Sequence, residues 1–402
     1  MSVFAGPNVL IRDGLVLSYD VANSRSYDRY ENLLTNSIRT ANALGATSGS
    51  GWTITANSGV SPDGTLTATQ LNQTSSLSNS GILWLSPPIS SGRVLSVFCK
   101  AVSTGTVIIQ GQSGNGDGYT ANLSNNTFTD GSGGRHPGGK VEEGSSGWKR
   151  VSVPMVGNVG NDFYLTVQGT GTVLLWGWQL ENGSVATDYY PTSGTAKNRG
   201  TTWTNLIGTG NNGTLTNGPR FNSTSNGVIV FDGANDYVIC GTTSSLTFTN
   251  QISVCIWLSS NNTASTYQVP IAKTTSTAAP GATNGFGWWI FSYGIGGFWI
   301  NNSPIVVGNP LALLNGQGIM SYLVGTYNGT TVGAYAGGLL GSTISFTTST
   351  IANNVNAPIE IGRGSTTGYF NGNVAHVSIY NRALSAAEVQ QNFNATRGRY
   401  GV

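Results

Sequence analysis

Charge is what this sequence has least of. Only 8% of its 402 residues are Asp, Glu, Lys or Arg, against about 25% in an average globular domain. The basic residues are scattered singly and the formal net charge is +2, so no surface that follows a phosphate backbone is expected. We therefore predict that neither nucleic acid nor an anionic membrane is a partner.

Cysteine and histidine are also scarce, which removes several kinds of chemistry. Cys99, Cys240 and Cys255 show no CxxC spacing, so they predict neither a disulfide framework nor a metal motif. Free thiols are favoured over a Cys240–Cys255 bridge. The two histidines, His136 and His376, lie near no G-x-S-x-G motif, and the strand pattern predicts that His376 is either packed or at a sheet edge.

Long apolar runs are missing as well. No stretch approaches the ~18 apolar residues of a membrane-spanning helix. The N-terminus lacks the basic and apolar regions of a signal peptide. We therefore predict synthesis in a cytoplasm, with no membrane insertion.

Glycine and short runs of β-branched and aromatic residues are abundant. The chain holds 57 glycines, and strand-like runs such as ISVCIWL alternate with Gly, Asn or Pro. Asn328–Gly329 is a favoured pair for a tight hairpin turn. The pattern predicts an all-β protein of jelly-roll or sandwich architecture, and the length predicts two or three domains.

One short helix is expected at the C-terminal end, in LSAAEVQQNFNATRG. Ser385 is the expected N-cap, and Glu388 three residues later completes a capping box. Val389 and Phe393 share one face of this helix, and Gly398 provides a stop. The helix should therefore lie against a β-sandwich.

Two families are resembled by separate parts of the chain. The chain from Arg199 onward resembles laminin-G-like, concanavalin A-like jelly rolls. The segments that carry this resemblance are RGTTWTNL, GVIVFDGANDYV and YNRALS. The opening strand of such a domain is similar to GLVLSYDVANSRSY, which lies upstream at 14–27. The intervening GWKRVSVP and WGWQLENGSVATDYYPT resemble a carbohydrate-binding-type jelly roll. Both types are common in virion proteins of tailed phages.

The resemblance implies that one domain interrupts the other. We expect residues 1–30 and 197–402 to form the split laminin-G-like sandwich, and residues 31–196 to form the inserted jelly roll. Jelly-roll termini often lie close together, so one sandwich can be spliced into a surface loop of another. It follows that Gly14–Tyr19 should pair with strands formed after Arg199.

Acidic residues are too few for the glycan hydrolysis that many concanavalin A-like folds perform. Glycoside hydrolysis usually needs two carboxylates flanking one bond, and this chain has 16 Asp and Glu and no E-x-D-x-x-E motif. The adjacent Glu142 and Glu143 would point to opposite faces of a strand. We therefore predict no catalytic residues and no enzyme activity.

Asp232 and Asp236, in FDGANDYV, are weak candidates for calcium. Ca²⁺ takes roughly six to eight oxygen ligands, so two carboxylates under-fill a site. A turn at Asp232–Gly233, with Asp236 capping the loop, is the favoured interpretation. No cofactor is expected, with calcium as the alternative.

Aromatic residues are the best candidates for a binding site, because sugars stack on Trp and Tyr rings while amides bind their hydroxyls. Trp148, Trp178 and Trp257 are expected in cores. Adjacent Trp288 and Trp289 must face opposite sides of a strand, so one should be exposed or at an interface. A place in the sandwich wall or in a subunit interface is favoured for any single residue. The candidate glycan-binding residues are Trp84, Trp288, Trp289, Tyr293, Trp299 and Asn301.

Together these features predict a structural protein on the surface of a tailed-phage virion. It would serve in capsid decoration, as a head fibre or as a tail fibre, and would bind host surface glycan weakly. Its other partners would be virion proteins and further copies of itself. A receptor-binding adhesin at the tail tip is the alternative, and a glycan hydrolase is less favoured. The inserted domain is the better candidate for meeting a ligand.

Overall fold

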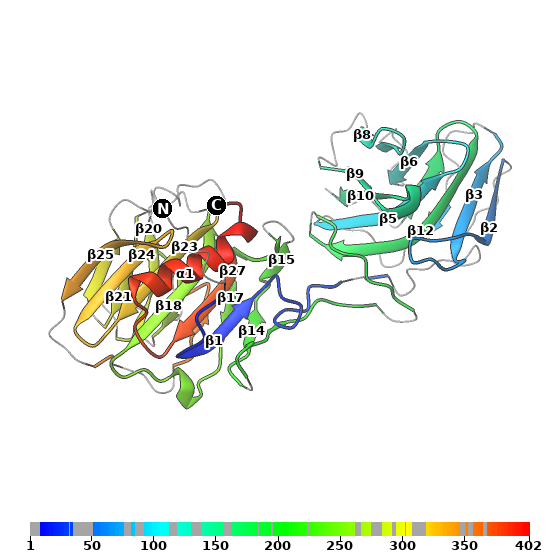
Figure 1. The fold of residues 1–402 in the computed structure, drawn as a ribbon. Helices are drawn as coiled ribbons and strands as arrows, with labels where there is room; N and C mark the ends of the chain where they lie inside the picture. The colour runs from blue at the N-terminus through cyan, green and yellow to red at the C-terminus, as the bar shows by residue number, and fades with distance from the viewer. Residues whose placement is uncertain are drawn as a thin grey trace, which may run out of the picture. The chain divides into compact units, whose positions relative to one another are not determined.

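The chain forms two compact units in the computed structural model (Figure 1). The outer domain comprises residues 1–29 and 200–402, and the inserted domain comprises residues 30–199. These bounds lie within three residues of the expected ones. The structure describes residues 9–31, 33–34, 51–75, 82–84, 92–111, 119–129, 138–155, 162–183, 185–193, 196–208, 210–222, 226–261, 267–274, 284–291, 295–301, 303–307, 319–345, 350–352, 357–364 and 368–402.

The outer domain contains two antiparallel sheets. The first sheet has the order β15-β16-β27-β18-β23-β24-β25, with β1 also paired to β27. Its strands are β1 (Leu15–Asp20), β15 (Arg220–Asn222), β16 (Val228–Asp232), β18 (Ile252–Ser260), β23 (Ser321–Tyr327), β24 (Thr331–Ala336), β25 (Leu339–Ser345) and β27 (Asn371–Tyr380). The second sheet has the order β13-β14-β17-β26-β19-β20-β21-β22. Its strands are β13 (Thr202–Trp203), β14 (Gly213–Thr216), β17 (Tyr237–Ile239), β19 (Gln268–Lys273), β20 (Phe286–Phe291), β21 (Ile295–Ile300), β22 (Ser303–Val307) and β26 (Glu360–Ile361).

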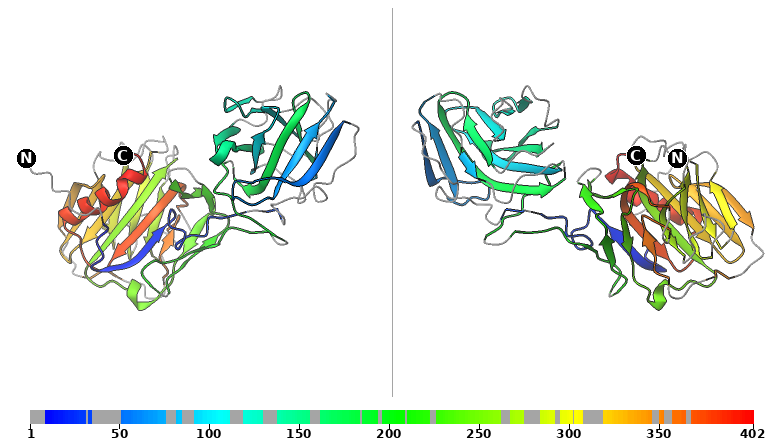
Figure 2. Two further views of the ribbon diagram at one scale, coloured as in Figure 1. Left: turned by 45° about the vertical axis from the view of Figure 1, so that its right-hand side comes forward. Right: turned by 180° about the vertical axis from the view of Figure 1, so that it is seen from behind.

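Strand β1 lies beside β27, a strand close to the C-terminal end of the chain, as the blue and orange-red strands of Figure 2 show. It pairs antiparallel with β27, and Tyr19 lies opposite Val377. Leu17 and Tyr19 are fully buried in the core between the two sheets. The prediction that this segment pairs with strands formed after Arg199 is therefore confirmed.

Alternation along the strands builds two apolar layers in the outer domain. In β18, Val254 and Ile256 face the core between the sheets, whereas Cys255 and Trp257 face the opposite side. Successive side chains of a strand point to opposite faces, so a fully apolar strand needs cover on both. Helix α1 (Ala386–Thr396) supplies part of that cover, because the Phe393 ring stacks on Trp257 with centroids 5.8 Å apart.

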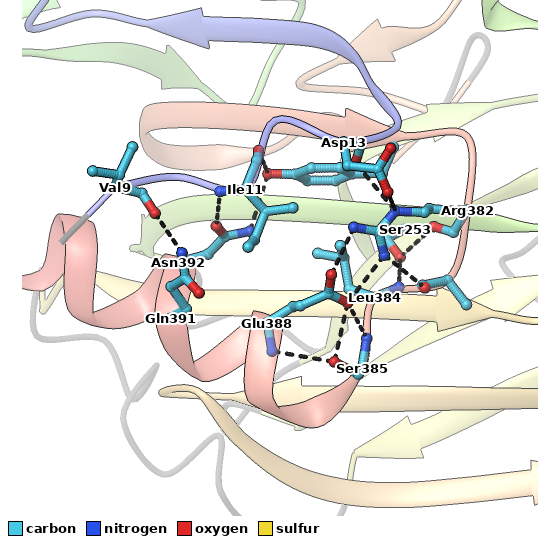
Figure 3. A network of polar contacts seen from close by, with 12 residues as sticks. Val9, Ile11, Asp13, Ser253, Arg382, Leu384, Ser385, Glu388, Gln391 and Asn392 are labelled. Carbon is cyan, nitrogen blue, oxygen red and sulfur yellow. Dashed lines mark hydrogen bonds and ion pairs between the residues drawn. The ribbon is translucent and has the colours of Figure 1, made fainter. Parts of the chain in front are cut away.

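Helix α1 begins as the sequence predicts. The Ser385 side chain accepts a hydrogen bond from the Glu388 backbone N–H, and Ser385 N donates to Glu388 Oε2 at 2.8 Å, which completes the capping box (Figure 3). Arg382 donates to both Glu388 carboxylate oxygens, at 2.7 and 3.0 Å. These bonds hold the pKa of Glu388 down at about 2, with the Arg382 bond as the main cause.

The same helix also holds the N-terminal segment of the outer domain (Figure 3). Ile11 N donates to Asn392 Oδ1 at 2.8 Å, and the Tyr380 hydroxyl donates to Ile11 O at 3.0 Å. Asn392 is fully buried, and its amide donates back to the Tyr380 hydroxyl. Both ends of the chain are thus fixed to one another across β27.

The inserted domain also contains two antiparallel sheets. The larger has the order β2-β3-β12-β5-β10-β9 and the smaller β4-β11-β6-β7-β8. The larger sheet consists of β2 (Trp52–Gly59), β3 (Ala68–Gln73), β5 (Arg93–Ala101), β9 (Lys140–Glu143), β10 (Lys149–Met155) and β12 (Gly171–Asn182). The smaller consists of β4 (Ile82–Trp84), β6 (Thr106–Gly111), β7 (Tyr119–Asn122), β8 (Thr127–Thr129) and β11 (Asp162–Val167). Leucine and valine side chains of both sheets, with Trp178, form its core.

Short 3₁₀ turns complete the described secondary structure, at Ser145–Gly147, Ser244–Leu246 and Arg397–Arg399. The prediction of an all-β fold with a short C-terminal helix is confirmed. No helix in the described parts of the chain has the length and apolar character needed to span a membrane.

The two segments that connect the domains run side by side. In the outer domain, Gly200 N donates to Asp28 O at 3.0 Å. In the inserted domain, Arg199 Nη2 lies 3.6 Å from Glu31 Oε2 and 3.4 Å from Glu181 Oε1. Entry and exit are therefore adjacent, which is the geometry that an insertion into one loop requires.

Candidate functional site

Trp288 and Trp289 face opposite sides of β20, but neither is exposed. Trp288 is fully buried between the sheets, and Trp289 is 7% exposed on the other face of the second sheet. The expectation of an exposed ring in this pair is wrong. Local alternation gave the direction of each ring correctly, but the outer face of this sheet is itself an apolar cluster with Val269, Ala272 and Trp299.

The Trp299 ring packs over Gly287, its neighbour on the adjacent strand. It lies opposite Gly287, where an added Cβ would come within 2.3 Å of the indole Cη2. The ring therefore occupies the space above a residue with no side chain, and it is 1% exposed. A ring enclosed in this way presents no face on which a sugar can stack.

The remaining glycan-binding candidates are Asn301, Trp84 and Tyr293. The Asn301 amide donates to Thr350 O at 3.0 Å, and its oxygen accepts from Ala352 N at 2.7 Å, so both ends of the side chain are engaged. The backbone of Trp84 is in β4. The Trp84 side chain and the whole of Tyr293 lie outside the described residues.

Asp232 and Asp236 form a turn. Asp232 Oδ1 accepts from Ala234 N at 2.8 Å, and Asp236 Oδ2 accepts from Asp232 N at 3.1 Å. Burial, reinforced by the charge of Asp232, raises the pKa of Asp236 to about 6. Within the described ranges, no group of three or more His, Cys, Asp or Glu side chains could hold a metal ion. The pair is therefore accounted for by turn geometry.

Carboxylates elsewhere in the outer domain are also engaged in local structure. Glu360 pairs with Arg363 at 2.6 Å, and Asp20 pairs with Arg399 at 2.6 Å. Asp13 and Glu388 both pair with Arg382. Each of these four carboxylates therefore forms an ion pair within the outer domain.

His376 is packed beneath the C-terminal segment, which is one of the two positions that the sequence predicts. Its Nε2 and the Ser378 hydroxyl lie 3.0 Å apart, and both residues are 3% exposed. It lies opposite Asp20 in the β1–β27 pair, and Arg399 binds that carboxylate. Burial lowers the pKa of His376. The Ser–His–Asp grouping is thus closed to a substrate. His136 lies outside the described residues.

The three cysteines are also buried. Cys99, Cys240 and Cys255 are free thiols, all buried. Cys240 belongs to the core between the outer sheets, whereas Cys255 faces the helix-covered side of the first sheet. Free thiols were favoured over a Cys240–Cys255 bridge, and this is confirmed.

A cluster with partly exposed aromatic rings lies on the outer face of the larger sheet of the inserted domain. Phe98 of β5, Trp176 of β12 and Tyr189 form a three-ring cluster, which we call the aromatic trio. Ring centroids are 5.7 Å apart for Phe98 and Trp176, 5.8 Å for Phe98 and Tyr189, and 4.7 Å for Trp176 and Tyr189. Phe98 and Tyr189 are partly exposed, and Trp176 is 6% exposed beneath them.

Alternation and a β-bulge place these rings on the outer face. Leu95 and Val97 of β5 face the core, so Phe98 faces outward. In β12 the register shifts between Trp176 and Gln179. This shift accommodates outward Trp176 and inward Trp178 around Gly177. The Trp176 indole donates to Thr67 Oγ1 at 3.0 Å, which fixes its orientation.

Residues 187–190 form a strap across this face and bring in the third ring. Gln179 donates to Asp188 O at 3.2 Å and accepts from Tyr190 N at 2.7 Å. Glu181 accepts from Thr187 N at 3.0 Å. The strap is thus tied to β12 on both sides of Tyr189, which sets that ring against Trp176.

A buried charge supports the strap. Arg150 of β10 donates to Ser96 Oγ at 2.8 Å and to Thr187 O, and its guanidinium lies over the Phe98 ring, 5.5 Å from the centroid. Burial lowers the pKa of Arg150 and raises that of Glu181. These hydrogen bonds offset the cost of withdrawing the guanidinium from water, and they tie β5, β10 and the strap together beside the trio.

The trio was not among the residues singled out from sequence. Phe98 lies in a strand-like run and Tyr189 in the segment ATDYYPT, and the two come together only through the strap. In the segment RVLSVFCKA, alternation makes the Phe98 side chain point to the face opposite that of Val97. This is the one sequence signal that could have identified Phe98 as a surface residue.

Comparison with known proteins agrees with the fold of the outer domain. Residues 232–390 match the model of the concanavalin A-like lectin/glucanases superfamily, so this part of the chain is similar to that superfamily. No curated protein sequence matches the chain.

Similar solved structures include sugar-binding modules and toxin domains. One is domain 4 of AbnA, a GH43 extracellular arabinanase from Geobacillus stearothermophilus, in complex with arabinotriose, with 15% identity over 47% of this chain and 91% of that one, and a TM-score of 0.38. Another is the binding domain of Paraclostridial Mosquitocidal Protein 1, with 17% identity over 48% of this chain and 49% of that one, and a TM-score of 0.36. A third is the Ruminococcus gnavus IT-sialidase CBM40 bound to α2,3-sialyllactose, with 16% identity over 37% and 84%, and a TM-score of 0.30.

Proposed function

We propose that this chain is a glycan-binding structural protein of a tailed-phage virion, exposed on the particle surface, without enzyme activity. It binds sugar through the aromatic trio of its inserted domain. The observation that carries the proposal is the presence of two partly exposed rings, Phe98 and Tyr189, held against a buried Trp176.

The trio has the features that sugar binding uses. Sugar rings present apolar C–H faces that pack on aromatic side chains, while neighbouring polar groups bind the hydroxyls. The exposed Asp188 and the strap backbone border the trio. Because the hydrogen bonds of Arg150, Gln179 and Glu181 fix the strap in advance, binding does not have to order it, which favours affinity.

The carboxylates support a non-catalytic role. A glycosidase needs two carboxyl groups on either side of the bond to be cleaved. In the outer domain, Asp13, Asp20, Asp232, Glu360 and Glu388 are engaged by arginines or by turn amides. The Arg382 bond that holds the pKa of Glu388 at about 2 keeps that carboxyl charged, so Glu388 is a poor proton donor.

The virion role is supported by the sequence. The resemblance of both domains to modules of tailed-phage particles and the low charge of the chain fit a protein exposed to the environment.

Binding is tested with the purified full chain on an array of bacterial glycans and lipopolysaccharides. We expect weak binding that drops about fivefold or more in Phe98→Ala and in Tyr189→Ala, since an aromatic contact contributes about 1 kcal/mol or more. The matched control is Tyr267→Ala, which removes a ring that is 46% exposed in the outer domain. Equal binding by all three variants contradicts the assignment of the trio.

The other parts of the proposal have separate tests. Incubation with host polysaccharide should release no reducing ends, and a release that scales with protein concentration would argue for the hydrolase. Mass spectrometry and imaging of purified particles should find the chain on the outside of the virion. Its absence from intact particles would remove the virion role and leave sugar binding as a separate question.

A further inference from the structure

The hairpin that joins β2 to β3 carries a polar cluster beside the aromatic trio. Three hydroxyl side chains and one carboxylate form it, those of Ser61, Thr65, Thr67 and Asp63. Thr67 Oγ1 accepts the hydrogen bond of the Trp176 indole at 3.0 Å and lies 2.7 Å from Thr65 Oγ1. Thr65 Oγ1 in turn donates to Asp63 Oδ1 at 2.7 Å. A continuous chain of hydrogen bonds therefore links a ring of the trio to the Asp63 carboxylate.

Each hydroxyl proton of the polar cluster has an acceptor inside it. Ser61 Oγ and Thr65 Oγ1 both donate to Asp63 Oδ1, each at 2.7 Å. The Trp176 indole N–H only donates, so Thr67 Oγ1 accepts from it. The Thr67 proton then goes to Thr65 Oγ1, or to Ser61 Oγ at 2.9 Å. What the cluster offers to a ligand is therefore a set of acceptors.

Asp63 is the charged member of this set, and it is exposed. Its Oδ1 accepts from the two hydroxyls and from Thr65 N at 3.0 Å, whereas its Oδ2 has no hydrogen-bond partner among the described residues. Desolvation raises the pKa of Asp63, but the hydrogen bonds from Ser61 and Thr65 outweigh it and leave the pKa below its ordinary value. A Cβ added at the neighbouring Gly64 would meet no other atom within 4 Å. The hairpin thus presents a charged carboxylate oxygen to solvent.

Two exposed apolar side chains border the polar cluster. Val60 is 58% exposed and Leu66 is 61% exposed, one at each end of the hairpin turn. Val60 is fixed to the face of the trio, because its carbonyl accepts a hydrogen bond from the Trp148 indole at 3.3 Å, and Trp148 packs in one cluster with Trp176. Apolar surface and a carboxylate therefore occur together next to the trio.

We infer that Asp63 makes the trio select an amino sugar, whose free ammonium group donates to Asp63 Oδ2 while the sugar face packs on Phe98 and Tyr189. The inference rests on the proposed sugar binding by the trio and adds the chemical class of the sugar. An ammonium group has donors and no acceptor, so it matches a cluster that offers only acceptors. Hydrogen bonds between charged groups are also stronger than those between neutral groups.

The cations of this face lie on the other side of the trio. The strand order β2-β3-β12-β5-β10 places Trp176 of β12 between the hairpin and β5, and Lys100 belongs to β5 and Arg150 to β10. The Arg150 guanidinium is already bound to Ser96 and lies over the Phe98 ring. An ammonium group therefore meets the carboxylate at the hairpin end of the trio, whereas an acidic sugar would be repelled there.

Two oligosaccharides that differ in one group test this selection. They are a glucosamine tetramer and an N-acetylglucosamine tetramer of the same linkage, titrated into the purified full chain by calorimetry. In about 20 mM salt we expect the glucosamine tetramer to bind about three- to fivefold more tightly, the range that an exposed ion pair supports. In about 0.5 M salt the two affinities should converge, because salt screens exposed charges.

Asp63→Asn removes the charge and keeps the Oδ1 acceptor of Ser61 and Thr65, so the hairpin should fold and the variant should melt like the natural chain. It should bind the two tetramers equally. Asp232→Asn is the matched control, because Asp232 is a turn residue of the outer domain whose Oδ1 accepts backbone amides in the same way. This control should keep the preference for glucosamine.

Equal binding of the two tetramers by the natural chain overturns the inference, as does a preference that survives in Asp63→Asn or is insensitive to salt. Binding of other glycans on the array, without binding of either tetramer, also overturns it. Each of these results leaves sugar binding by the trio standing. Binding of no glycan at all overturns the proposed function, and the selection of an amino sugar falls with it.

Discussion

At the scale of single residues, packing over a face decides what each polar or aromatic group does. Trp289 and Trp299 are closed within a cluster on the outer face of their sheet, whereas Phe98 and Tyr189 keep part of their rings in solvent. His376 and Ser378 are hydrogen-bonded to each other, but both are buried. Residue types that suggest chemistry in a sequence therefore become structural when another segment lies across them.

His376 gives a prediction on pH. Burial lowers its pKa in the folded chain below the ordinary value of 6.5, and Arg399 adds to this while Asp20 opposes it. As the pH falls below about 6.5, the unfolded chain binds a proton that the folded chain does not, so stability falls. The melting temperature should therefore decrease between pH 7.5 and 5 more steeply in the natural chain than in His376→Gln.

The control for this prediction is His136→Gln, which removes the other histidine. It should keep the pH slope of the natural chain. The same slope in the natural chain and in His376→Gln would show that His376 titrates alike in the folded and unfolded states, contrary to its burial.

At the scale of elements, hydrogen bonds position the C-terminal helix and the strap. The alternation of side chains along strands does not place these two elements. Helix α1 is held by its capping box and by Arg382, and its residue Asn392 binds the N-terminal segment. The strap at 187–190 is held by a hydrogen bond that Gln179 donates to Asp188 O and by one that Glu181 accepts from Thr187 N. Each element is therefore positioned by hydrogen bonds of polar side chains.

The helix cap gives a prediction on stability. Ser385→Ala removes the acceptor for the first-turn N–H groups, and we expect a loss of about 1 kcal/mol. In a domain of this size that corresponds to a melting temperature lower by about 2–4 °C. Ser385→Thr keeps the acceptor and should melt close to the natural chain. Equal melting of the alanine and threonine variants would mean that the cap adds nothing beyond the Arg382–Glu388 pair.

At the scale of the whole molecule, the insertion depends on two segments of the outer domain that lie next to each other, one before Tyr30 and one after Arg199. Gly200 N donates to Asp28 O, and Tyr27 forms a β-bridge with Trp203. The outer domain therefore closes its own loop without the help of the inserted domain, and its core between the sheets draws on residues on both sides of the insertion.

The insertion gives a prediction on autonomy. Replacement of residues 30–199 by a short Gly-Ser linker should leave a folded outer domain, because the linker spans two residues that are already hydrogen-bonded. Circular dichroism, a cooperative melt and dispersed NMR signals measure this. A product without a cooperative transition would show that the two units do not fold separately.

The sequence by itself determined the elements and their order. Alternating runs gave the strands, and Ser385 with Glu388 gave the helix start, because both signals depend on residues close together in the chain. The resemblance of the segments before Tyr27 and after Arg199 gave the pairing of β1, which is a long-range contact. The direction in which Trp288 and Trp289 point also followed from alternation.

Only the tertiary structure decided which faces are open. The burial of Trp299 depends on Gly287 of the neighbouring strand, and the aromatic trio depends on a strap that returns to β12 after a turn. The physical reason is that alternation sets the direction of a side chain, whereas its exposure is set by whatever segment packs above it.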